Sequence, residues 1–121
     1  MTTRPLPDSE LAVMEQLWRS GRLTARQIIE RLYPDAARPQ HGTVQRLLQR
    51  LEAKGFVERD RSLGINVFSP AIGREAYTSG QLESLAKRLG GGSLVPMVSR
   101  LVEDNKLSSA EIAKLRRVLE E

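Results

Sequence analysis

The feature that most constrains the fold of this chain is a change in the period of its apolar residues at Gly55. Before this glycine, apolar side chains recur at positions i, i+3, i+4 and i+7, which predicts a helix over residues 41–54. After it, residues 56–59 and 65–69 are rich in strand-forming side chains, and the polar stretch 60–64 between them ends in glycine. This pattern predicts a β-hairpin directly after the helix. The apolar stripe of the predicted helix consists of Val44, Leu47, Leu48 and Leu51.

Two shorter helices are predicted before this point. The first begins near Asp8, whose carboxylate is placed to accept a hydrogen bond from a backbone amide of the first turn. The second begins at a capping box formed by Thr24 and Gln27, and it ends before Pro34. Three helices followed by a hairpin is the element order of a winged helix-turn-helix. We therefore expect a mainly α-helical domain with a small β-hairpin wing over residues 1–72.

The remaining residues, 73–121, are predicted to form short helices whose apolar seams are too wide for them to bury by themselves. We expect a break at glycines 90–92 and a last helix that begins at a capping box of Ser108 and Glu111. A second copy of the chain is the economical cover, which predicts a helical dimerisation domain; the alternative is that these helices fold back onto the winged domain. The residues expected in the dimer interface are Leu82, Leu85, Leu89, Leu94, Met97, Val98, Leu101, Val102, Ile112, Leu115 and Leu119.

The composition excludes several classes of function. The chain has no cysteine and a single histidine, His41, which rules out disulfides, thiolate-bound metals and histidine-rich metal centres. It has no Gly-rich phosphate loop, metalloprotease motif or nucleophile–base pair, so we expect no enzyme activity, no cofactor and no metal site. No apolar run approaches the length of a membrane span, and the start lacks a signal-peptide core. We therefore expect no membrane insertion and a cytoplasmic location.

The polar face of the helix over residues 41–54 is the main candidate for function. The chain carries a net charge of +4, which is compatible with a nucleic-acid partner. Arginine can pair with guanine and glutamine with adenine in the major groove, and threonine can bind phosphate or contact a thymine methyl group. A solvated polar face is the alternative, but two preceding helices and a following basic hairpin favour DNA. The expected base-reading residues are Thr43, Gln45, Arg46, Gln49 and Arg50.

Four more residues are expected to contact the DNA backbone. Lys54 ends the helix, and Arg59 and Arg61 lie in the hairpin, where phosphate contacts would set affinity and salt dependence more than sequence preference. His41 stands at the N-terminus of the helix, where a phosphate can dock against backbone amides. The alternative for each of them is an ordinary solvent-exposed side chain.

Several segments resemble the penicillinase and methicillin-resistance repressors, the BlaI/MecI family. Residues 6–18 (LPDSELAVMEQLW) resemble the opening helix of the family, and residues 43–57 resemble its recognition helix and the exit from it. Residues 68–70 resemble the end of the strand after the wing, and residues 107–116 resemble the last helix. The order and spacing of these segments carry the resemblance over nearly the whole chain.

The resemblance implies a homodimeric transcriptional repressor that binds inverted-repeat operators of the TACA/TGTA kind, and that controls genes against β-lactams or related cell-envelope stress. In relatives with a membrane sensor metalloprotease as partner, repression ends when the protease cuts an Asn-Phe pair in the fifth helix. That position falls on Arg100 and Leu101 here, so the residues differ from the family's. Gly42 stands where the best-known members have a basic residue, and the cysteines of the copper-responsive branch are absent.

Two other functions stay open from the sequence alone. The winged domain can be a scaffold whose C-terminal seam binds a different protein, which predicts a monomer without salt-dependent DNA affinity. The chain can also be a regulator that responds to a small molecule, although the sequence shows no apolar pocket with convergent polar groups.

Overall fold

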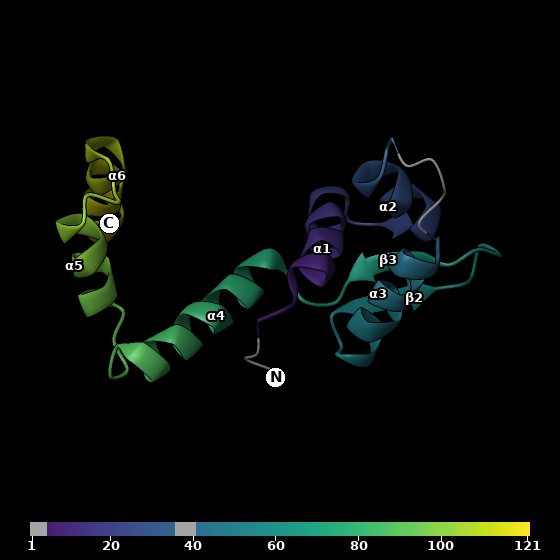
Figure 1. The fold of residues 1–121 in the computed structure, drawn as a ribbon, viewed down its shortest axis with the longest axis horizontal. Coiled ribbons are helices and arrows are strands. Elements are labelled where there is room, and N and C mark those ends of the chain that lie inside the picture. Colours follow the sequence, from purple (N-terminus) through teal and green to yellow (C-terminus); the bar gives the residue numbers. More distant parts are fainter. Residues whose placement is uncertain (1–4, 36–40) are drawn as a thin grey trace. The chain divides into compact units, whose positions relative to one another are not determined.

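The computed structural model describes residues 5–35 and 41–121, and the chain divides into two units, Met1–Ser79 and Gly80–Glu121. Within the described residues, the first unit contains three helices, a small sheet and the start of a fourth helix, which continues into the second unit (Figure 1). The polar connection predicted between the second and third helices lies largely outside the described residues. The elements are α1 (Asp8–Ser20), β1 (Leu23–Thr24), α2 (Ala25–Leu32), α3 (His41–Ala53), β2 (Val57–Asp60), β3 (Val67–Pro70), α4 (Arg74–Leu89), α5 (Val95–Glu103) and α6 (Ser109–Leu119).

Both predicted short helices are present, with one difference at the start of α1. Asp8 is the first helical residue and follows Pro7, and no side chain caps this helix. The expectation that Asp8 caps the first turn is therefore wrong. α2 begins at the predicted capping box, in which the Thr24 hydroxyl accepts from the Gln27 amide at 3.2 Å and the Gln27 side chain accepts from the Thr24 amide at 2.9 Å. Two of the free amide groups at the start of α2 thus have partners.

The predicted hairpin is present as part of a three-stranded antiparallel sheet with the order β1-β3-β2. β2 pairs with β3 from Val57 opposite Pro70 to Asp60 opposite Val67. β1, which the sequence did not reveal, places Leu23 opposite Phe68 on the other edge of β3. A strand of two residues has no alternation that a pattern can detect. Because β1 leads directly into α2, its pairing brings the N-terminus of α2 beside the hairpin.

The core of the first unit forms where the helices and the sheet meet. All four apolar residues that the sequence placed on one face of α3 are buried. Each fully buried leucine stabilises the fold by about 2 kcal/mol relative to an exposed one. The core residues that surround this stripe are Leu6, Val13, Met14, Leu17, Leu23, Ile28, Ile29, Phe56, Val57 and Phe68.

Aromatic and ionic contacts hold the start of α4 in the first unit. The ring of Tyr77 lies 5.8 Å from the rings of both Trp18 and Phe56. Arg74 donates to both carboxylate oxygens of Glu15, at 2.9 and 2.7 Å, and lies over the Trp18 ring. The structural division therefore falls inside α4, whereas the sequence placed the domain boundary just before this helix.

The second unit consists of the rest of α4 together with α5 and α6. The predicted glycine break ends α4, and a Cβ atom at Gly90 would lie 2.0 Å from the carbonyl oxygen of Ser93. Gly91 and Gly92 have φ angles of 60° and 92°, which favour glycine. α5 begins at Val95, and α6 begins at the predicted capping box.

The second unit leaves much of its apolar surface uncovered. α5 and α6 have no buried residue, and Leu89 and Leu119 are 74% and 82% exposed. Of the residues expected in a dimer interface, Leu82, Val98, Leu101, Val102 and Leu115 are also exposed. The remaining four are half-buried: Leu85, Leu94, Met97 and Ile112. No helix in the described part of the chain is long and apolar enough to cross a membrane.

The turn at the tip of the hairpin is held by Asp60. Its carboxylate accepts from the Ser62 amide at 2.8 Å and from the Arg22 guanidinium at 2.9 Å. Gly64, with a φ angle of 83°, donates to the carbonyl of Arg61 at 3.1 Å. The hydrogen bonds from Ser62, and after them the charge of Arg22, hold the pKa of Asp60 below its ordinary value of 3.8.

A buried ion pair joins the exit of α3 to α1. The Lys54 ammonium group lies 2.5 Å from the carboxylate of Glu10, whose side chain is only 2% exposed. Among the described residues, Glu10 is the one charged residue that is buried, and the Lys54 ammonium group is its ion-pair partner. A buried carboxylate without a partner is costly, so the pair fixes where α3 ends.

We expect Lys54→Met to lower the free energy of unfolding by about 2 kcal/mol, between the values typical of exposed and of fully buried pairs. The reason is that it leaves the Glu10 carboxylate buried without its cation. Chemical denaturation measures this loss, with Lys114→Met in α6 as the matched control. Adding Glu10→Gln to Lys54→Met should restore part of the stability. Equal losses in the single and double variants would contradict the role of the pair.

The lowered pKa of Asp60 predicts a wing turn that loosens only in acid. A carboxylate whose pKa is lowered by folding stabilises the fold at pH values above its pKa in the unfolded chain. This contribution is lost as the pH falls through its pKa in the folded protein. NMR titration of the Asp60 carboxyl carbon should therefore give a midpoint below 3.8, with the Ser62 amide shifting in step. Arg22→Gln should raise this midpoint, whereas Arg116→Gln in α6 should not. A wild-type midpoint at or above 3.8 would refute the assignment.

Candidate nucleic-acid interface

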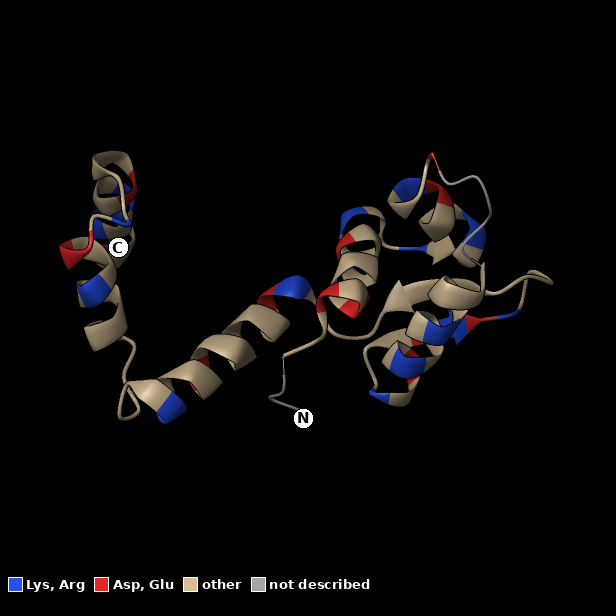
Figure 2. Ribbon diagram, in the orientation of Figure 1, with Lys and Arg blue, Asp and Glu red and all other residues tan. Residues whose placement is uncertain are grey.

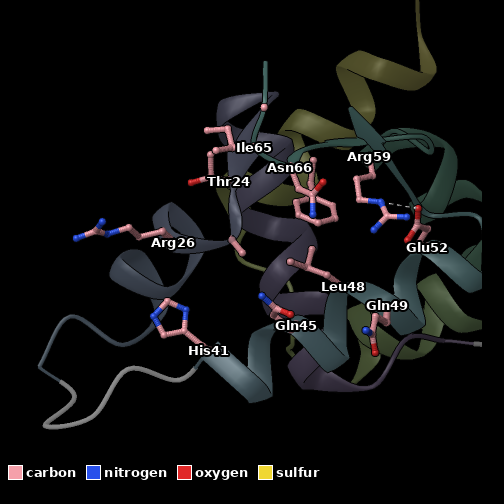
Figure 3. Close-up of a pocket in the computed structure, with 13 residues that line it drawn as sticks. Thr24, Arg26, His41, Gln45, Leu48, Gln49, Glu52, Arg59, Ile65 and Asn66 are labelled. Carbon is pink, nitrogen blue, oxygen red and sulfur yellow. Dashed lines mark ion pairs between the residues drawn. The ribbon is translucent and has the colours of Figure 1, made fainter. Parts of the chain in front are cut away.

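The outer face of α3 borders a hollow of about 580 Å³ that three elements of the first unit form together. Figure 3 shows α3 on one side of this hollow, the hairpin on the other, and the N-terminal end of α2 at one end. The capping box fixes the start of α2, and the pairing of β1 with β3 brings that start beside the hairpin. The hollow is lined by Thr24, Ala25, Arg26, His41, Gln45, Leu48, Gln49, Glu52, Arg59, Gly64, Ile65, Asn66 and Phe68.

The structure divides the predicted base-reading residues of α3 between two flanks. Gln45 and Gln49 line the hollow (Figure 3). Successive residues of a helix are turned by about 100°, so Arg46, Arg50 and Thr43 fall on the other side of the outward face. Arg46 and Arg50 are exposed, and Thr43 is half-buried. The helix therefore offers neutral hydrogen-bonding groups toward the hairpin and guanidinium groups away from it.

Two of the residues expected to contact phosphate have partners within the protein. Arg59 lies 3.4 Å from the carboxylate of Glu52, which joins β2 to α3 across the hollow (Figure 3). Lys54 is held by Glu10 at the exit of α3. Both side chains thus also stabilise the fold of the first unit, and their contact with DNA phosphate stays a prediction.

The free cations lie elsewhere on the same unit. Among the described residues, Arg46, Arg50 and Arg61 form no ion pair with an acidic side chain. Figure 2 shows Lys and Arg along α3 and near the hairpin. Glu52 and Asp60 are paired with Arg59 and Arg22, so these two acids are not ion-pair partners of Arg46, Arg50 or Arg61.

His41 is the first residue of α3; it is exposed and lines the hollow. The docking of a phosphate beside His41 stays a prediction. The sequence reasoning missed Arg26 and Ile65, which line the same hollow. The capping box at Thr24 already marked Arg26 as a cation in the first turn of α2, whereas no pattern indicated that Ile65 lines the hollow.

Known proteins support this architecture. The chain matches the family model described as penicillinase repressor over residues 6–121. It is 29% identical over 116 residues to the penicillinase repressor of Bacillus licheniformis, with 96% of this chain and 90% of the relative covered. It is 34% identical over 120 residues to the transcriptional regulator BlaI of Mycobacterium tuberculosis, with 96% and 83% covered.

Two solved structures share the fold. The YusO protein of Bacillus subtilis matches with a TM-score of 0.50 and 19% identity over 84% of this chain and 73% of that chain. The multiple antibiotic-resistance repressor (MarR) of Listeria monocytogenes matches with a TM-score of 0.51 and 16% identity over 95% and 71%. At these identities the likeness supports the fold alone, a mainly helical winged helix-turn-helix with a small sheet. The family match covers both units, and this chain belongs to the penicillinase repressor family.

Proposed function

We propose that this chain is a DNA-binding transcriptional repressor whose first unit inserts α3 into the major groove of an operator. The observation that carries the proposal is the outward face of α3, where Gln45, Gln49, Arg46 and Arg50 are exposed opposite a fully buried stripe. A helix of this kind fits the major groove, and its side chains match the hydrogen-bonding pattern of base edges. Membership of the penicillinase repressor family supports the repressor role.

The two flanks of α3 have separate tasks in this proposal. Gln45 and Gln49 pair with adenine on the side of the hollow, and Arg46 and Arg50 pair with guanine on the other side. Arg61 in the hairpin binds the phosphates that border the groove. Arg26 at the start of α2 does the same, because its contact with Glu30 at 3.5 Å is solvent-exposed and therefore weak. His41 and the backbone amides of the first turn of α3 contact a further phosphate of the DNA backbone in this proposal.

The protein acts as a homodimer in this proposal, with a second copy covering the second unit. The support is the apolar surface of α4, α5 and α6, which carries exposed side chains such as Leu89, Val98, Leu101 and Leu119. Dimeric helix-turn-helix proteins bind inverted repeats, because the two-fold axis of the protein coincides with that of the operator. The genes that it controls are those for resistance to β-lactams or related cell-envelope stress, by analogy with the penicillinase repressor of Bacillus licheniformis.

Release of the repressor from DNA through cleavage by a membrane sensor metalloprotease at Arg100 and Leu101 has less support than DNA binding by α3. Both residues lie inside α5, and Arg100 is within 4 Å of Glu103 and Asp104. A protease binds its substrate in an extended form, so cleavage here requires α5 to unwind first. The pair also differs from the Asn-Phe site of the family members that are cleaved.

Removing one arginine from α3 should weaken binding in a sequence-dependent way. The probe is a duplex obtained by in vitro selection from random DNA, and fluorescence anisotropy gives the affinity. Arg46→Ala should cost about 1–3 kcal/mol and relax the preference at one base pair, because a bidentate contact with guanine is lost. Arg61→Ala should instead weaken all duplexes alike and reduce the salt slope by about one.

Arg88→Ala is the matched control for both variants, because it removes the same charge from the end of α4, outside the first unit. No binding of wild-type protein to any selected duplex at low salt would refute the DNA-binding function. An Arg46→Ala variant that behaves like Arg88→Ala would refute the role of α3.

A charge on the apolar side of α5 should separate the two copies. Sedimentation equilibrium of the wild-type chain should give twice the 13.6 kDa of one chain, and Leu101→Asp should give the single mass. Ala113→Asp adds the same charge to α6 at a position whose helical neighbours are Ser109, Ala110, Arg116 and Arg117, and this variant should stay dimeric. A wild-type monomer without salt-dependent affinity for DNA would instead favour a protein-interaction module.

A further inference from the structure

Two large apolar side chains stand uncovered at the tip of the wing. Leu63 is 73% exposed and Ile65 is 58% exposed. Among the described residues of the first unit, no other large apolar side chain is this exposed. Most other large apolar residues of that unit pack in or against one core, so core packing does not explain why apolar side chains stand at these two positions. Figure 1 shows that the loop between β2 and β3 projects away from the body of the unit.

The turn that carries this pair is fixed before anything binds to it. β2 and β3 stay paired up to Asp60 opposite Val67, and the Asp60 carboxylate holds the Ser62 amide at 2.8 Å. Gly64 then closes the turn onto the carbonyl of Arg61. Leu63 and Ile65 thus lie on a pre-ordered turn, and this turn loses little conformational entropy when a partner contacts the two side chains.

The surroundings of the pair indicate a nucleic acid as the partner. Ile65 lines the same hollow as Gln45 and Gln49 of α3 (Figure 3). Arg61 stands beside the pair without an acidic partner, and the acid of the turn, Asp60, is already paired with Arg22. Two side chains are also far too small an area for a stable protein interface. Continuity with the face of α3 and the positive charge both match DNA.

The neighbouring surface of that DNA is a minor groove. When a helix occupies a major groove about 12 Å wide, a hairpin that projects beside it crosses the bordering phosphates to the next minor groove. On the floor of that groove, G·C pairs differ from A·T pairs by one donor, the N2 amino group of guanine. An apolar side chain over this group leaves its donor without a partner, whereas over A·T pairs no donor is buried.

We propose that Leu63 and Ile65 form an apolar contact with the minor groove beside the site of α3, and that this contact selects A·T pairs there. This inference rests on the proposed function, and it adds a specificity element that uses no hydrogen bond and no charge. Apolar side chains from other DNA-binding proteins act on minor grooves, where they pack against or between base steps.

The experiment compares three versions of the selected operator duplex, in which the base pairs flanking the α3 site are A·T, G·C or inosine·C. Inosine lacks the N2 amino group, so inosine·C keeps the major groove of G·C but has the minor groove of A·T. Wild-type protein should bind the A·T and inosine·C duplexes equally and the G·C duplex about five-fold more weakly, since one unpaired donor costs about 1 kcal/mol.

The double variant Leu63→Ser, Ile65→Ser should bind all three duplexes with the same affinity and with the salt slope of the wild type. Arg61→Ala is the control from the same turn, and it should keep the five-fold preference while lowering the salt slope. Thermal unfolding of the double variant should match that of the wild type, because both side chains are exposed and neither belongs to the buried core.

The outcomes separate this inference from the proposed function. Wild-type protein that binds no selected duplex refutes the DNA-binding function itself. Wild-type protein that binds all three duplexes equally, or a double variant that keeps the preference, refutes only the contact by Leu63 and Ile65. Loss of self-association by the double variant without DNA would overturn the proposal and assign the pair to a second copy of the chain.

Discussion

The rest of the structure depends on the burial of one face of α3. Val44 and Leu51 are fully buried, and Leu47 and Leu48 are at most 5% exposed. Turning the helix by one residue, about 100°, would carry a charged or amide side chain into a core that offers no partner for it. The cost of burying such a group far exceeds any gain from a different contact with DNA. The same burial that folds the first unit therefore decides which side chains face outward.

The exit from α3 transmits this constraint to the wing. Gly55 has a φ angle of 81°, and the Phe56 amide donates to the carbonyl of Leu51 at 2.9 Å, so the chain turns sharply into β2. Phe56 is 1% exposed and fills the core below the turn. The ion pair of Lys54 with Glu10 holds the same corner from the side of α1. The hairpin consequently has a defined direction relative to α3, as the proposed binding to two neighbouring grooves requires.

The sequence predicts those parts of the fold that depend on local spacing. The stripe of α3, the two capping boxes and the glycine break after α4 are each encoded within a few residues, and each is present. The parts it does not predict depend on contacts between distant residues. β1 is defined only by its pairing with β3, and the partners of Lys54 and Arg22 lie 44 and 38 positions away. For the same reason the candidate DNA-binding residues of α3 could be named from the sequence, whereas the protein partners of Lys54 and Arg22 could not.

The two units differ in how far they bury their apolar side chains, and in the proposed function this difference links dimerisation to DNA binding. The first unit closes its own core, while α5 and α6 leave every residue at least partly exposed. A single winged unit makes few phosphate contacts, so its affinity for DNA at physiological salt is low. In the proposed homodimer, binding of one unit raises the effective concentration of the other at the second half-site. On this proposal, any event that weakens the contact between the two copies at α5 and α6 lowers operator affinity without touching α3, so repression would be controlled through the second unit.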